Sequence, residues 1–113
     1  MPHCTIELSS QLTSQPHQIL NLAFSALSSS QLFQDKDIKV RLLPYDHFKV
    51  GNGDQLFIHA SVSILSGRNI DQKKDLSTRL LSEIKTYFSD QTNLVITVDI
   101  RDMDSNSYQK ETK

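Results

Sequence analysis

Residues 55–65 have the sequence QLFIHASVSIL, and they are followed by SGRN at 66–69 and IDQKKDLSTRLLSEIKTYF at 70–88. In the first segment, apolar residues occupy both alternating sets of positions, which is typical of a strand whose two faces are both covered. In the last segment, apolar residues recur every four positions, which predicts a helix with one buried stripe. That stripe consists of Leu76, Leu80, Ile84 and Phe88. The stretch therefore predicts a strand, a short connection and a helix.

A second strand is predicted after this helix, at residues 93–101. Apolar and polar residues alternate there, as expected for a strand with one buried face. The apolar positions are Leu94, Ile96, Val98 and Ile100. A strand, a helix and another strand in succession form a right-handed βαβ unit, in which the two strands are parallel.

The first half of the chain repeats this order. Residues 2–8 alternate between apolar and polar side chains and predict a strand. Pro16 is well placed in the first turn of a helix, and residues 38–43 predict another strand, which Pro44 should stop or bend at a sheet edge. The apolar positions of the helix are Ile19, Leu20, Ala23, Phe24 and Leu27. The predicted fold is therefore α/β (an α+β sandwich), in which two consecutive βαβ units form a four-stranded sheet with two helices on one face.

The chain is predicted to be a single domain, 1–113, with a core of about 2–101 and a polar tail, 102–113, that we expect to be mobile. The sheet face opposite the helices mixes polar side chains with apolar ones. Its polar members are Thr5, Lys39, Arg41 and Thr97. An open face of this mixed character predicts contact with another subunit, and hence a homo-oligomer.

Composition excludes several classes of partner and location. The 113-residue chain has a formal net charge of −1 and a pI of about 6.4, so we expect neither nucleic acid nor an anionic membrane as a partner. No stretch approaches the roughly 18 consecutive apolar residues of a membrane span. Cys4 is the single cysteine, which excludes an internal disulfide and fits a reducing compartment. The N-terminus also lacks a basic segment followed by an apolar one, so we expect a cytoplasmic protein.

Pro2 is the strongest candidate for a catalytic group. If Met1 is removed, the Pro2 nitrogen becomes a secondary amine with a free lone pair. A free α-amino group has a pKa of roughly 7.7–8.0, and burial or nearby cations would lower that pKa towards neutrality. Pro2 would then be a general base near physiological pH. The alternative is that Pro2 merely follows the initiator methionine and has no chemical role.

Several segments together resemble one known family. They are Pro2-His3, Ile6-Glu7 and Ser9 in the first strand, Phe57-Ile58-His59 through Val62 and Ile64 to Gly67-Arg68, the helix end Glu83-Ile84-Lys85-Thr86-Tyr87-Phe88, and Asp99-Ile100. Their order and spacing are similar to those of the 5-carboxymethyl-2-hydroxymuconate isomerases, a branch of the tautomerase superfamily. This resemblance implies the tautomerase fold, assembly as a homotrimer, and proton transfer by an N-terminal proline that needs no metal or organic cofactor.

The resemblance also implies a set of substrate-binding residues. Arginines bind the substrate's carboxylates in this family, and the arginine after the third strand falls on Arg68. The family's second-strand arginine falls on Lys39, two residues before Arg41, which points to the same face. Lysine keeps the positive charge but lacks the planar, bidentate guanidinium group, so the preferred substrate could differ. The tail also looks shorter and more polar than in the family, which leaves tail-dependent subunit contacts open.

We therefore predict a cofactor-independent isomerase in which Pro2 moves a proton within an enol dicarboxylate of the 5-carboxymethyl-2-hydroxymuconate type, as in bacterial aromatic catabolism. Arg68 and either Arg41 or Lys39 would bind the two acidic ends. One alternative keeps Pro2 as the base but takes other enol acids, such as aryl pyruvates. Another is a non-catalytic oligomeric binding module, which a retained Met1 would favour.

Other candidate groups have structural explanations. The four histidines lack the tight spacing of a metal site. Cys4 lies on the apolar side of its strand, where a free cysteine behaves as a small hydrophobe rather than a nucleophile. Arg41 also has a structural alternative, because it could pair with Glu7 or Asp99.

Overall fold

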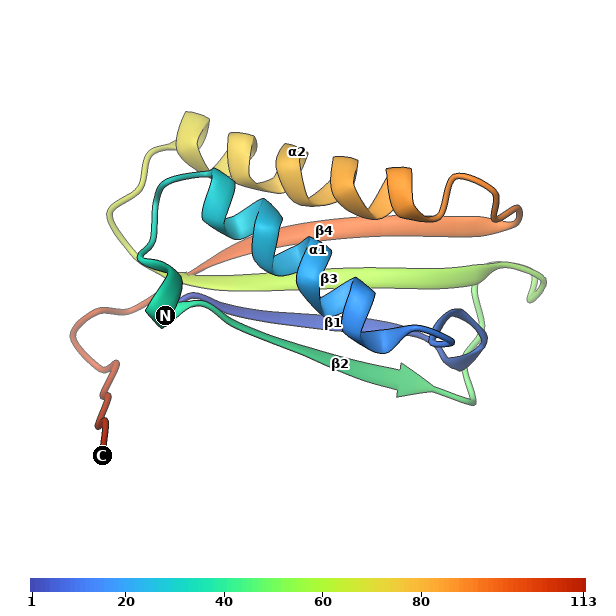
Figure 1. Ribbon diagram of the computed structural model, residues 1–113, viewed down its shortest axis with the longest axis horizontal. Coiled ribbons are helices and arrows are strands. Elements are labelled where there is room, and N and C mark those ends of the chain that lie inside the picture. The colour runs from blue at the N-terminus through green and yellow to red at the C-terminus, as the bar shows by residue number, and fades with distance from the viewer.

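The computed structural model describes residues 1–113 as one four-stranded sheet with two helices on one face (Figure 1). The strands are β1 (His3–Ser9), β2 (Lys39–Tyr45), β3 (Leu56–Leu65) and β4 (Leu94–Met103). The helices are α1 (Pro16–Ser29) and α2 (Ile70–Tyr87), and two short 3₁₀ helices are η1 (Ser10–Leu12) and η2 (Asp35–Asp37). This arrangement confirms the predicted fold class.

The strand order β2-β1-β3-β4 shows how the two βαβ units join. β1 is parallel to β2, and β3 is parallel to β4, as the crossover rule predicts. The two units meet through the antiparallel pair of β1 and β3, in which His3 lies opposite Ser63. Because this central pair is antiparallel, the first residues of β1 and β2 lie at the same end of the sheet as the last residues of β3 and β4.

This end of the sheet is called the amino end below, and the opposite end is called the far end. The amino end holds His3, Lys39, Leu65 and Met103. The far end holds Ser9, Tyr45, Leu56 and Leu94. Both chain termini lie at the amino end (Figure 1), so this end collects residues from the beginning, the middle and the end of the sequence.

One hydrophobic core lies between the sheet and the helices. Alternate residues of the two central strands are fully buried there: Cys4, Ile6 and Leu8 in β1, and Ile58, Ala60, Val62 and Ile64 in β3. The predicted α2 stripe contributes Leu76, Leu80 and Ile84, while Phe88 follows the helix and packs partly buried against the same core. Burying an aliphatic side chain of this size stabilises a fold by roughly 1.5–3 kcal/mol. The strand register is therefore strongly specified, because a slip of one residue would expose this set.

The start of α2 is fixed by its own side chains. The Asn69 side chain accepts a hydrogen bond from the Gln72 backbone N–H at 2.8 Å, and the Gln72 side chain accepts one from the Asn69 N–H at 2.9 Å. Such a capping box satisfies two backbone donors that have no partner inside the helix. It fixes the turn between β3 and α2, so Arg68 is held at the amino end just before the helix.

Two strands are longer than the sequence predicts. β2 continues through Pro44 to Tyr45, so the proline does not stop the strand but lies on a sheet edge, the second of the two predicted alternatives. β2 is an edge strand that pairs only with β1, and an edge strand tolerates proline because its outer side needs no ladder hydrogen bond. β4 runs to Met103, past the predicted end at residue 101, and stays paired with β3 as far as Leu65.

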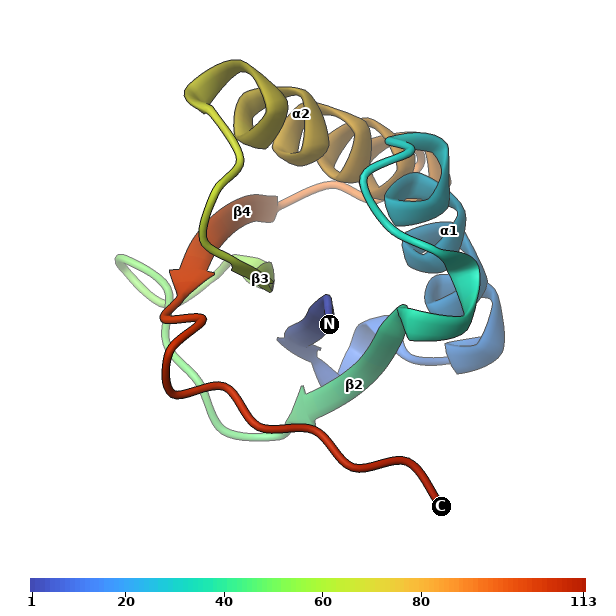
Figure 2. The same ribbon diagram turned by 90° about the vertical axis from the view of Figure 1, so that its left-hand side faces the viewer.

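The segment after β4 turns back across the amino end (Figure 2). The backbone N–H groups of Ser107 and Tyr108 both donate to the Asp104 carbonyl at 3.1 Å. The tail then reaches η2, where the Lys110 ammonium group pairs with the Asp37 carboxylate at 3.1 Å. The polar residues after 102 thus contact the rest of the domain at two places, through Tyr108 and Lys110.

The sheet face opposite the helices carries the polar residues predicted for it. They include Thr5, Lys39, Arg41 and Thr97. The register places Lys39 beside His3 and Arg41 beside Thr5. Leu43 is 48% exposed on the same face. Neither α1 nor α2 combines the length and the apolar character needed to cross a membrane.

Candidate active site

Pro2 lies at the amino end, immediately before β1. Its side chain is fully buried. Its carbonyl oxygen accepts a hydrogen bond from the Lys39 backbone N–H at 3.1 Å. This bond ties the residue before β1 to the first residue of β2, so the sheet itself sets the position of Pro2.

Met1 extends the chain beyond Pro2 into the same surroundings. Its side chain packs against the hydrophobic core, with Sδ 3.5 Å from the Leu65 N–H nitrogen. Its amino group lies 3.4 Å from the Tyr108 hydroxyl. Burial lowers the pKa of this amino group below its usual value, and the positive charges of Lys39 and Lys110 lower it further. The amino end therefore disfavours the protonated form of an amine placed there.

The two second-strand cations differ in their surroundings. Lys39 is half-buried, and its Nζ donates to the Asp37 backbone carbonyl at 3.0 Å. The Lys39 charge also lowers the pKa of the N-terminal amino group. Arg41 is exposed, and its Nη1 lies 3.5 Å from Nδ1 of His3. Of the two, Lys39 is thus the cation that acts directly on the amino terminus.

The structural alternative for Arg41 is wrong, because no ion pair joins Arg41 to Glu7 or Asp99, and each of these carboxylates has another partner. Glu7 accepts a short hydrogen bond from the Tyr45 hydroxyl, and this bond raises the pKa of Tyr45. Asp99 pairs with Arg101 at 2.6 Å. Arg41 is therefore free of a carboxylate partner within the chain.

Arg68 lies at the amino end, but its side chain is engaged by the connection after α1. Its Nη2 donates to the Leu32 backbone carbonyl at 2.6 Å. Its guanidinium carbon lies 5.6 Å from the centre of the Phe33 ring, within the range of a cation–π interaction. No hydrogen bond joins Arg68 to Pro2 or Lys39. The structure brings Lys39 next to Pro2 but does not join Arg68 to them.

Tyr108 is a residue of this site that the sequence analysis missed. Its hydroxyl lies 3.1 Å from Nε2 of His3, and the two rings meet edge-on with centroids 6.1 Å apart. Burial, and then the charges of the N-terminus and Arg41, lower the pKa of His3, so its ring is neutral near pH 7. Arg41 can only donate, so the tautomer that satisfies both contacts carries its proton on Nε2 and donates it to the Tyr108 oxygen. One sequence signal was available: Tyr108 is the only aromatic residue after Phe88.

A cavity of about 350 Å³ opens beside these residues. Its lining consists of Lys36, Asp37, Lys39, Lys110 and Thr112. Three ammonium groups and one carboxylate give the lining a formal net charge of +2, which favours an anionic ligand. Of these three lysines, only Lys39 was predicted from the sequence. Nothing in the local sequence around Lys36 or Lys110 indicates that the three side chains share a cavity.

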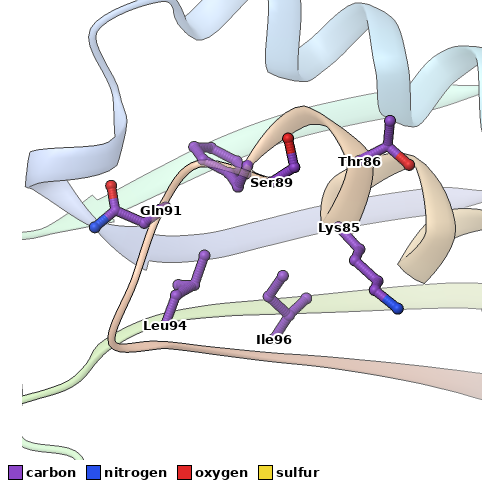
Figure 3. Close-up of a pocket in the computed structure, with 7 residues that line it drawn as sticks. Lys85, Thr86, Ser89, Gln91, Leu94 and Ile96 are labelled. Atoms are coloured by element: carbon purple, nitrogen blue, oxygen red, sulfur yellow. The ribbon is translucent and has the colours of Figure 1, made fainter.

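A larger cavity, of about 430 Å³, lies at the far end, between the end of α2 and the start of β4 (Figure 3). It is lined by Lys85, Thr86, Phe88, Ser89, Gln91, Leu94 and Ile96. Lys85 is the single charged residue of this lining, and none of the predicted site residues contributes to it. General acid–base chemistry needs a titratable group held near the reacting atoms, so the smaller cavity at the amino end is the better candidate despite its size.

Two further groups weighed in the sequence analysis have structural roles. Cys4 is fully buried, and burial raises the pKa of its thiol to about 12, so the reactive thiolate is not populated near pH 7. Nδ1 of His59 lies 2.6 Å from the Thr97 hydroxyl on the neighbouring strand.

The chain matches one family model and is similar to several solved structures. A model of the family described as 5-carboxymethyl-2-hydroxymuconate isomerase matches residues 2–113. Among solved structures, the chain is similar to a 5-carboxymethyl-2-hydroxymuconate isomerase from Deinococcus radiodurans R1, with 19% identity, a TM-score of 0.89, and coverage of 99% of this chain and 90% of that one. It is also similar to a 5-carboxymethyl-2-hydroxymuconate delta-isomerase, with 16% identity, a TM-score of 0.87, and coverage of 100% and 89%.

A third similar structure is a fused 4-OT protein described as a symmetric trimer, with 15% identity, a TM-score of 0.75, and coverage of 92% of this chain and 87% of that one. No curated protein matches the sequence. At these identities the solved structures show a shared fold and nothing finer, so the family rests on the match over residues 2–113.

Proposed function

The chain belongs to the 5-carboxymethyl-2-hydroxymuconate isomerase family, and we propose that it moves a proton within an enol acid of the 5-carboxymethyl-2-hydroxymuconate type. That compound has a carboxyl group at each end of its conjugated chain and a third on its carboxymethyl arm. It is an isomerase of the tautomerase superfamily. Pro2 would be the general base, and the cations around it would bind the substrate's carboxylates. The observation that carries the proposal is the position of a buried Pro2 beside a cation-lined cavity.

The base would be the free nitrogen of Pro2 after Met1 has been removed. Burial and the charges of Lys39 and Lys110 lower the pKa of the amino group that the chain carries at this end. The same influences would act on the Pro2 nitrogen, which lies one residue further along the chain. A lowered pKa would leave a larger fraction of the amine neutral near pH 7, as a general base requires.

Removal of Met1 would also make room for a substrate. The Met1 side chain packs against the core beside the end of β3, with Sδ near the Leu65 backbone. Without Met1, that apolar space would be empty next to Pro2. Lys39, which lines the cavity, binds the Pro2 carbonyl through its backbone N–H. A dicarboxylate could then place its carbon chain near Pro2 and an acidic end near Lys39.

The proposed reaction has two proton transfers. The neutral Pro2 amine takes the proton of the enol hydroxyl, and the bonding electrons move through the conjugated system as the carbonyl forms. The protonated amine then delivers a proton to carbon, which restores the neutral base. Negative charge develops on the substrate between these steps, and the cations at the amino end would stabilise it.

Lys39 and Arg41 are the proposed carboxylate-binding residues nearest to Pro2. Lys39 is tied to Pro2 through the backbone, and Arg41 lies on the same sheet face, free of a carboxylate partner. Arg68 donates one hydrogen bond to the Leu32 carbonyl, and its guanidinium group has further N–H donors that could bind a carboxylate. We therefore assign Arg68 a substrate-binding role in which the connection after α1 positions its side chain.

We also propose a homotrimer. The support is the fold shared with the fused 4-OT protein that is described as a symmetric trimer, together with the mixed polar and apolar sheet face on which Leu43 is 48% exposed. Light scattering coupled to size-exclusion chromatography would give a mass near three times 12.9 kDa for a trimer.

A second candidate substrate class is the enol form of other acids, such as aryl pyruvates. The observation that favours it is Lys39, which stands where the family has an arginine and cannot make a planar bidentate contact with a carboxylate. A panel that pairs 5-carboxymethyl-2-hydroxymuconate with an aryl pyruvate would rank the two classes by kcat/KM.

The deciding experiment is an ultraviolet assay of 5-carboxymethyl-2-hydroxymuconate isomerisation, using protein whose intact mass shows that Met1 is absent. We expect turnover that falls as the pH is lowered, because the base becomes protonated. The matched control is protein that retains Met1, prepared with the methionine aminopeptidase inhibited, which should be inactive. Equal activity of the two forms would contradict Pro2 as the base. Complete retention of Met1 in the native protein would instead favour a binding module.

A further inference from the structure

The lysine-lined cavity adjoins the position proposed for the reacting proton. Lys39 contributes its side chain to the cavity, while its backbone N–H binds the Pro2 carbonyl at 3.1 Å. Lys39 and Lys110 both act on the amino group at the N-terminus. An anion held in this cavity would therefore lie beside the proposed base.

Lys110 is held over the cavity by its own ion pair and by a contact made two residues before it. Its ammonium group pairs with the Asp37 carboxylate at 3.1 Å, and this hydrogen bond lowers the pKa of Asp37. Two residues earlier, the Tyr108 hydroxyl contacts His3 at 3.1 Å. The tail is thus attached to β1 by Tyr108 and to η2 by Lys110, which fixes the direction from which Lys110 approaches the cavity.

The lining remains cationic after these internal contacts are counted. Asp37 offsets one of the three ammonium charges, and the backbone carbonyl of Asp37 accepts from Lys39. No carboxylate pairs with Lys36 or Lys39. Like charges brought this close repel one another, and a bound anion would relieve that repulsion.

We infer that this cavity binds a carboxylate of the substrate, and that Lys110 and Lys36 determine specificity for a substrate with a second acidic group. The inference rests on the proposed function and names the residues that select the substrate's charge. The C-terminal tail is then a part of the active site, since it supplies Lys110.

The choice of lysine has a chemical consequence. An ammonium group is a compact charge with three rotatable donors, whereas a guanidinium group is a planar fork. Three ammonium groups from different segments can bind a carboxylate in several orientations. The cavity is therefore suited to a carboxylate at the end of a flexible, saturated carbon arm, while a planar conjugated acid end gains less from it.

The first test compares Lys110→Ala with Lys85→Ala, which removes a lysine from the far-end cavity. We expect KM for 5-carboxymethyl-2-hydroxymuconate to rise about 10-fold in Lys110→Ala, through loss of one charge-assisted hydrogen bond. On the high-pH plateau, where Pro2 is neutral with or without the Lys110 charge, kcat should change less than about twofold. Lys85→Ala should leave KM unchanged. Lys110→Arg should recover most of the affinity because it restores the charge. Equal KM values for all four proteins would overturn the inference.

A binding measurement keeps the test independent of turnover. The probe is adipate, a saturated dicarboxylate, with hexanoate as the comparator that lacks the second carboxylate, and binding is followed by calorimetry at low and high salt. We expect adipate to bind the processed protein more tightly than hexanoate, and salt to weaken adipate binding because exposed charges are screened. Lys110→Ala should bring adipate binding close to that of hexanoate.

The two proposals fail in different ways. If Pro2→Ala abolishes turnover but Lys110→Ala binds adipate as well as the unaltered protein does, the carboxylate site is wrong and the base assignment stands. If adipate binding depends on Lys110 but no form of the protein isomerises any enol acid, the site stands and the proposed reaction is wrong.

Discussion

The amino end and the far end of the sheet each carry a cavity, and the two differ in chemistry more than in size. The amino-end cavity, of about 350 Å³, is lined by three lysines, an aspartate and a threonine. The far-end cavity, of about 430 Å³, has three apolar residues and one lysine in its lining (Figure 3). The amino end also holds Pro2, His3 and Tyr108, which are joined by contacts between segments far apart in the chain.

This difference follows from how each end is built. The far end is formed by local turns, such as the one between α2 and β4, and its apolar residues continue the hydrophobic core. The amino end is where the termini, η2 and the connection to α2 meet (Figure 2). Each of these segments contributes one or two charged or polar groups, so together they form a polar cluster at the amino end. Charge and the position of Pro2, rather than volume, therefore distinguish the candidate site.

The largest expected effect is on turnover, at the amino end. Pro2→Ala should lower kcat by roughly 100-fold or more, because general base catalysis contributes about 10²–10⁴-fold and alanine offers a less basic primary amine. KM should change much less. The measurement is steady-state kinetics on protein of confirmed N-terminus, with circular dichroism to show that the variant is folded. Unchanged turnover would show that Pro2 is not the base, and the amino end would no longer be favoured over the far end as the site of the reaction.

The next effect is on stability, at the far end. Ile84 lies near the end of α2 and is 1% exposed, so Ile84→Ala should lower the free energy of unfolding by about 2–5 kcal/mol. At temperatures where the variant is folded, kcat should stay close to that of the unaltered protein. Urea unfolding and the isomerase assay together test this. A large loss of kcat in folded Ile84→Ala would show that the far end takes part in the chemistry.

A smaller effect is expected from the hydroxyl that attaches the tail. Tyr108→Phe removes the contact with His3, a loss of about 0.5–1.5 kcal/mol, and should raise KM a few-fold by loosening Lys110. The matched variant is Tyr87→Phe, since the Tyr87 hydroxyl donates to Gln18 on the helix layer at 3.0 Å. Faster hydrogen exchange in residues 104–110 of Tyr108→Phe alone would confirm the attachment. Identical KM and exchange in both variants would contradict it.

The smallest effect concerns pH. Burial and nearby positive charges lower the pKa of His3 in the folded state, so the unfolded chain binds a proton at His3 more readily than the folded chain does. Stability should therefore decrease slightly as the pH falls below about 6.5, the ordinary histidine value, and through the lowered pKa. Nuclear magnetic resonance titration of the His3 ring should give a midpoint below that value. A midpoint above it would show that the positive surroundings of the amino end are not those described.

The elements that follow a short sequence period could be predicted well. Leu76, Leu80 and Ile84 line the buried face of α2 as their spacing indicates, and β3 and β4 pair in parallel as the crossover rule requires. Each of these features depends on neighbours within a few turns of chain. The sequence left open whether Pro44 stops β2 or lies within an edge strand, because proline's effect depends on whether the strand has one neighbour or two, and only the strand order decides this.

The candidate site could be predicted only in part. Pro2 and Lys39 were found from position and resemblance, and the sheet does bring them together. Arg68 was selected in the same way, yet its guanidinium group is engaged by Leu32 and Phe33, whose approach depends on the path of the connection after α1. No local pattern in the sequence encodes that path.

The two βαβ units, their buried stripes and the proline at position 2 follow from the sequence alone, because periodicity and residue type act over short distances. The tertiary structure decided which ends of the units coincide, since the antiparallel pairing of β1 with β3 puts both termini at one end. It also placed Lys110 against Asp37 and Tyr108 against His3. Both contacts join residues far apart in the chain. They can form only after packing of the core has fixed the positions of the segments that carry these residues.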